Sequence, residues 1–277
     1  MLRDLRFCNA AIKLNPIETN FPKLDRLQYS DLNTDCNHNL QISELIAKNR
    51  STIRHLELGF ERYIAMNTFY LVNGRRYDLS RAQEKFWEVF QERESWLYLN
   101  SLRLMFFNFS KKSFLAFDFQ NLVSLRLESC IRDSEILSFL TVSNSTSNMT
   151  KMSKLTSFYL RHESLNTAFH ANLKAFLLSF SGLKHLSLLL QGIDPVASIT
   201  PFLKNHGATL ESLVWDQQFK QRLCAAIRTD VMKDRPSYKY KEEIAMVCPN
   251  LRELGLVSEI SCEDRYEASR AFNDCYP

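Results

Sequence analysis

The stretch Leu-Val-Ser-Leu-Arg-Leu, residues 122–127, carries the pattern that decides the fold: leucine, two residues, leucine, one residue, large apolar residue. We call this six-residue pattern the phrase. It returns along the whole chain, with starts at Leu2, Leu24, Ile53, Leu99, Leu122, Leu155, Leu183, Leu210 and Leu251. Random placement of leucine would give about two such phrases, so nine of them indicate a repeat protein.

The phrase also predicts which side chains face the interior. Its fourth and sixth residues are large and apolar in all nine copies. On a β-strand, residues two apart point to the same face, so these two positions should be buried and the residues flanking them should face outward. Segments with helical spacing follow several strands, at Asp133–Phe139, Asn166–Phe180 and Asp194–Asn205. One such unit cannot bury its own apolar side, so neighbouring units must stack.

These features predict an α/β fold, a leucine-rich-repeat solenoid shaped like a horseshoe, with irregular repeats and a parallel sheet on its concave face. We expect a single domain over residues 1–277. Three stretches interrupt the repeat: an inserted helical segment at about 59–98, and flexible loops at about 141–154 and 228–241. Both loops are polar, and the second is also basic, which is typical of exposed connections.

The inserted segment combines a turn signal with a helical pattern. Asn73-Gly74 predicts a turn, and the run from Ser80 to Glu94 predicts a helix. Phe86, Trp87 and Phe90 would form the apolar stripe of that helix. Packing into the core is the favoured role for these aromatic residues, and partner binding is the alternative.

Composition excludes several classes of protein. Lys plus Arg exceeds Asp plus Glu by 35 − 31 = 4, too small an excess for a nucleic-acid binder. No stretch reaches the roughly 18 uncharged apolar residues of a membrane helix, and the first residues lack the apolar run of a signal peptide. The seven cysteines are scattered without a C-x-x-C pair, which predicts reduced thiols, no structural metal and a cytoplasmic or nuclear location.

No catalytic or cofactor motif is present, so we expect neither an enzyme nor a cofactor. The chain has no G-x-S-x-G, P-loop, H-E-x-x-H or G-x-G-x-x-G pattern. His55 and His185 share one phrase position, which places them in one column of the sheet rather than beside an acid or a nucleophile.

The concave face is the predicted functional surface. Its middle strands carry arginine and tyrosine, which are enriched at protein-binding hot spots, and arginine pairs well with carboxylate or phosphate. We therefore expect a protein partner, with an acidic or phosphorylated segment as its favoured feature. The alternative is an ordinary solvated face, partly neutralised by Glu57 and Glu128. The predicted partner-binding residues are Arg103, Met105, Arg126, Glu128, Tyr159, Arg161 and His185.

Two stretches resemble a known family. Asn121-Leu-Val-Ser-Leu-Arg-Leu-Glu-Ser-Cys-Ile-Arg-Asp133 resembles a cysteine-containing leucine-rich repeat, and Cys248-Pro-Asn-Leu-Arg-Glu-Leu-Gly-Leu256 has the opening of the same type. Both are similar to repeats of fungal F-box/leucine-rich-repeat proteins. The resemblance implies the substrate-recognition region of an F-box type ubiquitin ligase, with an Skp adaptor and a cullin as further partners.

The chain departs from that family in one respect, because no F-box pattern precedes the first repeat at Leu2. The main alternative is therefore a stand-alone repeat scaffold or regulator with no ubiquitin link. An enzyme with a site that no motif reveals, and a fragment of a longer gene, are the remaining alternatives.

Overall fold

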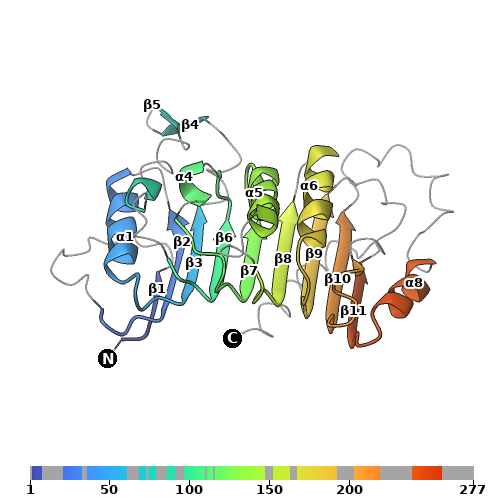
Figure 1. The fold of residues 1–277 in the computed structure, drawn as a ribbon. Coiled ribbons are helices and arrows are strands. Elements are labelled where there is room, and N and C mark those ends of the chain that lie inside the picture. The colour runs from blue at the N-terminus through green and yellow to red at the C-terminus, as the bar shows by residue number, and fades with distance from the viewer. Residues whose placement is uncertain are drawn as a thin grey trace.

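The computed structural model describes residues 2–7, 21–32, 36–60, 69–72, 75–78, 86–90, 97–109, 111–114, 116–146, 152–162, 167–191, 203–218 and 239–257. A single open sheet of parallel strands runs through this part of the chain (Figure 1). Its order is β1 (Asp4–Phe7), β2 (Arg26–Leu32), β3 (His55–Phe60), β6 (Ser101–Met105), β7 (Ser124–Glu128), β8 (Ser157–His162), β9 (His185–Gln191), β10 (Ser212–Gln218) and β11 (Glu253–Val257). The strands of this sheet therefore follow one another in chain order, with β4 (Phe69–Val72) and β5 (Arg75–Asp78) outside it between β3 and β6.

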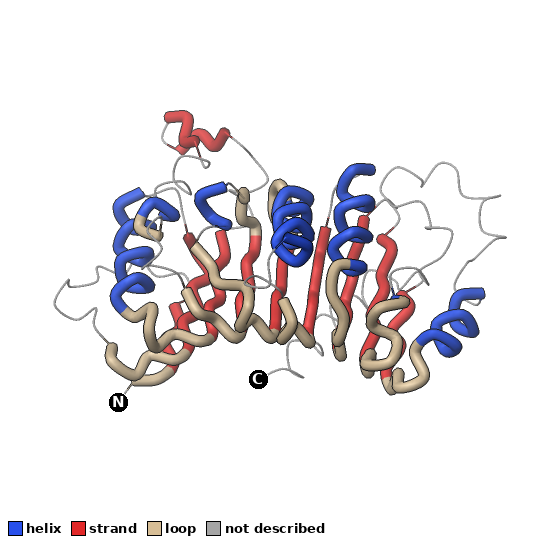
Figure 2. The backbone as a smooth tube through the Cα atoms, in the orientation of Figure 1, coloured by secondary structure: helices blue, strands red, loops and turns tan. Residues whose placement is uncertain are grey.

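The helices lie along one side of this sheet (Figure 2). They are α1 (Cys36–Lys48), α4 (Lys111–Phe114), α5 (Asp133–Thr146), α6 (Thr167–Leu178) and α8 (Lys239–Val247). Apolar side chains of all five belong to the same buried core as the strands, for example Ile136 of α5 and Leu104 of β6. The core is thus a layer between the helices and one face of the sheet, and the other face of the sheet is not covered by these helices.

The strands pair in a register that aligns the phrases with one another. Residues in the same phrase position pair directly across every strand boundary, so Glu57 pairs with Arg103, Arg103 with Arg126, and Arg126 with Tyr159. Along β6 and β7, buried and partly exposed residues alternate as the phrase predicts. The alternation weakens at the two ends of the sheet, where Leu5 is partly buried and Leu254 is exposed.

A second regularity joins the phrases at the start of each strand. The backbone carbonyl of the second phrase residue accepts N–H groups from the second and third residues of the next phrase. The Asn100 carbonyl accepts from Val123 at 2.8 Å and from Ser124 at 3.0 Å, and every junction between successive phrases repeats this geometry. The backbone polar groups at this edge are therefore satisfied between neighbouring units.

Two of the three predicted helices are confirmed in the described residues. Asp133–Phe139 lies within α5, and Asn166–Phe180 contains α6. Residues 194–202 of the third lie outside the described residues, and Leu203 is helical.

The predicted loop at about 141–154 is wrong over its first residues, because α5 continues to Thr146. The Thr141 hydroxyl donates to the Leu137 carbonyl one turn earlier at 2.8 Å, so this side chain bonds within the helix instead of ending it. Residues 147–151 lie outside the described residues, and Met152 is buried ahead of the next phrase. Of the predicted loop at about 228–241, residues 239–241 form the start of α8, and the rest lies outside the described residues.

The inserted segment at about 59–98 is only partly helical. Residues 86–88 form a helical turn, and the segment also contains the antiparallel hairpin of β4 (Phe69–Val72) and β5 (Arg75–Asp78). Asn73-Gly74 and most of the predicted helix from Ser80 to Glu94 lie outside the described residues. The core role of the aromatic stripe is confirmed, because the side chains of Phe86, Trp87 and Phe90 are all buried.

Candidate functional site

The sheet face opposite the helices, which we call the open face, carries all seven residues predicted to bind a partner. Arg103 and Met105 lie on β6, Arg126 and Glu128 on β7, Tyr159 and Arg161 on β8, and His185 on β9. They occupy the third, fifth and seventh phrase positions, which alternate with the buried positions, and every one of them is partly exposed.

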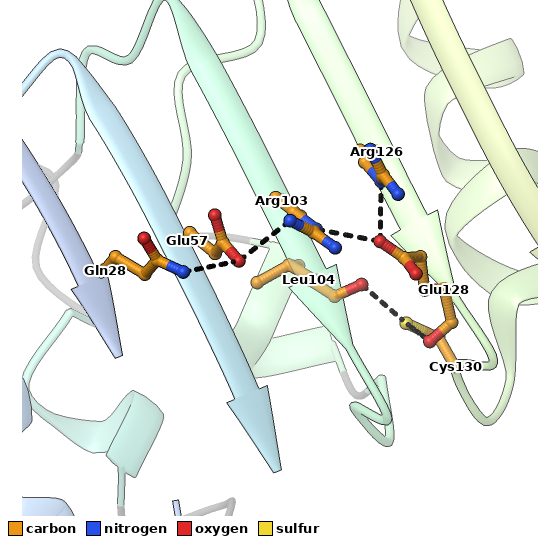
Figure 3. A network of polar contacts seen from close by, with 7 residues as sticks. All are labelled: Gln28, Glu57, Arg103, Leu104, Arg126, Glu128 and Cys130. Carbon is orange, nitrogen blue, oxygen red and sulfur yellow. Dashed lines mark hydrogen bonds and ion pairs between the residues drawn. The ribbon is translucent and has the colours of Figure 1, made fainter. Parts of the chain in front are cut away.

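A chain of ion pairs and hydrogen bonds crosses the open face from β2 to β7 (Figure 3). Gln28 Nε2 donates to Glu57 Oε1 at 3.1 Å, and Arg103 lies 2.9 Å from the same oxygen. Glu128 Oε1 then accepts from Arg103 Nε at 2.8 Å and from Arg126 Nε at 2.5 Å. The four charged side chains are between 13% and 26% exposed, so these contacts are only partly screened by solvent.

This chain of contacts changes the interpretation of the arginines. Arg103 is held between Glu57 and Glu128, and Arg126 is held by Glu128. Two positive and two negative side chains cancel, so the middle of the face is not an open cationic patch. Arg103 and Arg126 are thus neutralised by Glu57 and Glu128, which is the alternative that the sequence left open.

Tyr159 extends this row of side-chain contacts onto β8. The Arg126 guanidinium carbon lies 4.1 Å from the centre of the Tyr159 ring, which is a cation–π contact. Burial raises the pKa of Tyr159 to about 12, and the nearby negative charge of Glu128 adds to the effect. The phenol therefore stays protonated at neutral pH and can donate a hydrogen bond.

A groove of about 750 Å³ runs across the open face from β1 to β10. Third and fifth phrase residues form most of its lining, with Met105 at one margin. Arg103, Arg126, Tyr159 and His185 line it, whereas Glu128 and Arg161 lie beside it in the seventh-position row. The groove follows the register of the phrases across the sheet.

Sequence reasoning missed the small residues that line the groove. The third phrase residue is serine in four strands, and these short side chains leave space above the sheet: Ser101, Ser124, Ser157 and Ser212. Reading the third letter of each phrase as a column would have found them. Only the histidines in that column, His55 and His185, were singled out, and both line the groove.

Cys130 and Cys248 are buried rather than exposed on the open face. Cys130 is buried, and its Sγ lies 3.4 Å from the Leu104 carbonyl of the preceding strand. Burial raises the pKa of this thiol far above its usual range, and it also raises the pKa of the Cys248 thiol. Neither sulfur is therefore activated as a nucleophile.

Among the described residues, a buried histidine–aspartate pair lies on the helix side of the sheet. His162 Nδ1 lies 2.6 Å from Asp133 Oδ2, and both side chains are buried. The imidazole stacks on Phe169 with ring centroids 3.6 Å apart. Neither His162 nor Asp133 lines the groove, so this pair links β8 to the start of α5 and packs within the core.

Two further findings concern ligands and membranes. Among the residues that the structure describes, no group of three or more His, Cys, Asp or Glu side chains could hold a metal ion. None of the described helices is both long and apolar enough to cross a membrane.

Comparison with known proteins adds no relative. No protein-family model, no curated protein and no solved structure matches the chain.

Proposed function

We propose that this chain is a leucine-rich-repeat solenoid whose open face is the concave side of a horseshoe and binds another protein. The in-register stacking of the nine phrases supports the solenoid. The groove carries the functional part of the proposal, because eight strands contribute polar side chains to one continuous hollow. Protein-binding sites are enriched in tyrosine and arginine, and both residue types line this groove.

Two features favour binding over catalysis. The charged groups in the middle of the groove neutralise one another, and Tyr159 stays protonated at neutral pH. The buried His162–Asp133 pair lies outside the groove. A reaction needs an acid, a base or a nucleophile within reach of the substrate. Among the described residues, the one histidine–carboxylate contact of a groove-lining residue, His55 Nε2 to Asp25 Oδ2, is long at 3.9 Å, and both side chains are about one-third exposed or more.

The cellular role rests on the resemblance of residues 121–133 and 248–256 to fungal F-box/leucine-rich-repeat proteins. On that basis the groove holds the substrate of a ubiquitin ligase in the cytoplasm or the nucleus, and the chain assembles with an Skp adaptor and a cullin. A stand-alone scaffold would use the same groove without these proteins. The partner is expected to present an acidic or phosphorylated segment to the groove.

Affinity purification of the tagged chain from its own cells, followed by quantitative mass spectrometry, tests the proposal. The groove variant is Ser124→Lys with Ser157→Lys, which places two long side chains on the groove floor. The matched control is Ala171→Lys with Ala175→Lys, on the exposed side of α6. Circular dichroism and thermal unfolding establish that both variants keep the fold.

We expect wild type and control to recover the same partners, and the groove variant to lose about tenfold or more of them. Equal recovery by all three proteins would contradict a binding role for the groove. Recovery of an Skp adaptor and a cullin supports the ligase role, whereas stable partners without them support the scaffold.

A further inference from the structure

Near each end of the groove, on β2 and on β9, lie polar groups that have no partner within the described protein. At the β2 end, Arg26 lines the groove, and its guanidinium makes no hydrogen bond or ion pair with another described residue. Its neighbour Asp4 on β1 is already paired with Arg6 at 2.9 Å. Arg26 is thus a groove guanidinium available to an anion, in contrast to Arg103 and Arg126, which Glu57 and Glu128 engage.

At the β9 end, the unpartnered groups are a serine hydroxyl and an imidazole nitrogen. The Ser187 side chain lines the groove, is only 8% exposed, and its Oγ has no hydrogen-bond partner among the described residues. His185 lies two residues earlier on the same face, and its Nδ1 is also buried without a hydrogen-bond partner among the described residues. Buried polar groups are normally hydrogen-bonded, so a cluster of unpartnered ones in a groove points to a ligand.

The chemistry of the β9 end favours an amide side chain. A hydroxyl can donate or accept, and a neutral imidazole nitrogen does one or the other. Asn and Gln supply both a donor and an acceptor and carry no charge, so they avoid the cost of placing an ion in a partly buried site.

The floor between the two ends suits an extended main chain. The column from Arg26 to His185 passes through His55, Ser101, Ser124 and Ser157, which pair in register on adjacent strands. The three serine hydroxyls have no hydrogen-bond partner among the described residues, and they can bond peptide N–H or C=O groups. Five strand-to-strand steps of about 4.8 Å span about 24 Å, which is the length of about seven residues in an extended chain.

We propose that the groove takes an extended segment of the partner protein, lying across the strands. An Asp or Glu of that segment binds Arg26, and an Asn or Gln about seven residues away binds His185 and Ser187. This inference rests on the proposed protein-binding function and specifies the partner's chemistry. The acidic residue of the partner is thus expected at the β2 end of the groove and not in its middle.

A library of random 16-residue peptides displayed on phage, selected on the purified full chain, tests the inference. We expect enriched peptides to share an acidic residue and an amide residue six to eight positions apart. Synthetic copies should bind Arg26→Glu at least tenfold more weakly, and Ser187→Ala several-fold more weakly. The matched controls are Arg50→Glu and Ser181→Ala, at exposed residues outside the groove lining, and they should bind like wild type.

Exchange of charge provides the most specific check. A peptide whose acidic residue is replaced by Lys should recover affinity for Arg26→Glu and lose it for wild type, which a merely unfolded variant could not produce. Enriched peptides without the acid–amide spacing, or equal binding to Arg26→Glu and wild type, would overturn the inference.

The outcome can also separate the inference from the proposed function. If no peptide is enriched while the Ser124→Lys/Ser157→Lys variant still loses its cellular partners, the groove binds a folded surface. In that case the extended-segment inference is wrong and the protein-binding function stands. If the groove variant keeps all its partners, the proposed function itself fails.

Discussion

Glu128 is the residue that holds the middle of the open face together, because one carboxylate oxygen contacts two guanidinium groups. Its side chain is 13% exposed, and Arg103 and Arg126 approach it from adjacent strands. The phrase places two arginines side by side in register, and Glu128 removes the repulsion between them.

We therefore expect Glu128→Ala to lower the free energy of unfolding by about 1–3 kcal/mol, because it leaves two partly buried cations facing each other. Urea unfolding monitored by circular dichroism measures the change. Glu135→Ala is the matched control, since Glu135 is 53% exposed and pairs with Arg132 at 3.8 Å. The control should change stability by less than about 0.5 kcal/mol. Equal losses in the two variants would mean that the chain of contacts does not stabilise the fold.

Tyr159 makes stability depend on pH in the alkaline range. Its pKa is raised from 10.0 to about 12 in the folded protein, so the folded state favours the neutral phenol. The resulting stabilisation is complete below pH 10 and is lost as the pH rises from about 10 to about 12. Tyr159→Phe keeps the ring beside Arg126 and removes the titration. We expect wild type to lose more stability than this variant between pH 10 and 12, measured by urea unfolding. Parallel pH profiles would contradict the assignment.

At the scale of elements, His206 joins the end of α6 to the start of β9. The Leu183 N–H donates to Nδ1 at 3.3 Å, so the imidazole carries its proton on Nε2 and donates to the Leu177 carbonyl at 2.8 Å. The side chain is fully buried, and burial lowers the pKa of this histidine below its usual 6.5. The connection between a helix and the next strand thus depends on a neutral imidazole.

His206 should make the protein less stable in acid. As the pH falls below about 6.5, the unfolded chain takes up a proton that the folded state resists, and stability decreases until the lowered folded pKa is reached. His206→Gln removes this titration, so its stability should fall less than that of wild type between pH 7 and pH 5. Chemical unfolding at several pH values measures the difference. A variant with the wild-type slope would show that another group is responsible.

The inserted segment contributes Trp87 to the core, together with Phe86 and Phe90. Trp87 is 1% exposed and lies within 5.2 Å of the Phe117 ring and 5.6 Å of the Phe107 ring, between centroids. Trp87→Ala should lower the free energy of unfolding by about 3–5 kcal/mol, through lost burial and the cavity that remains. Met246→Ala, at a residue that is 84% exposed, is the control and should be close to neutral. A small effect of Trp87→Ala would mean that the segment packs only loosely on the sheet.

The elements also show where prediction from the sequence works. The strands were predicted because the apolar residues of the phrase must be buried, and burial fixes the register of Leu102, Leu125 and Phe158. The sequence mispredicts the end of α5, because serine, threonine and asparagine are typical of loops. Thr141 instead bonds back within the helix, which composition cannot reveal.

At the scale of the whole molecule, the sequence predicts that the seven chosen residues share one face of the sheet, but it does not predict the shape of the groove there. The seven chosen residues lie on the open face because strand periodicity decides which side each residue takes. The pairing of Arg103 with Glu57 and Glu128 depends on side-chain conformations that periodicity does not determine. The groove depends on small residues in the third phrase position, which a search for charge and aromatic rings passes over.

The central claim is that a protein partner sits on the open face. Site-specific photocrosslinking in living cells tests it most directly, with a photoreactive amino acid placed at Met105 on the groove margin or at Arg50, outside the groove lining. We predict covalent adducts with a partner protein from position 105 and none from position 50. Adducts from position 50 with none from position 105 would contradict the account.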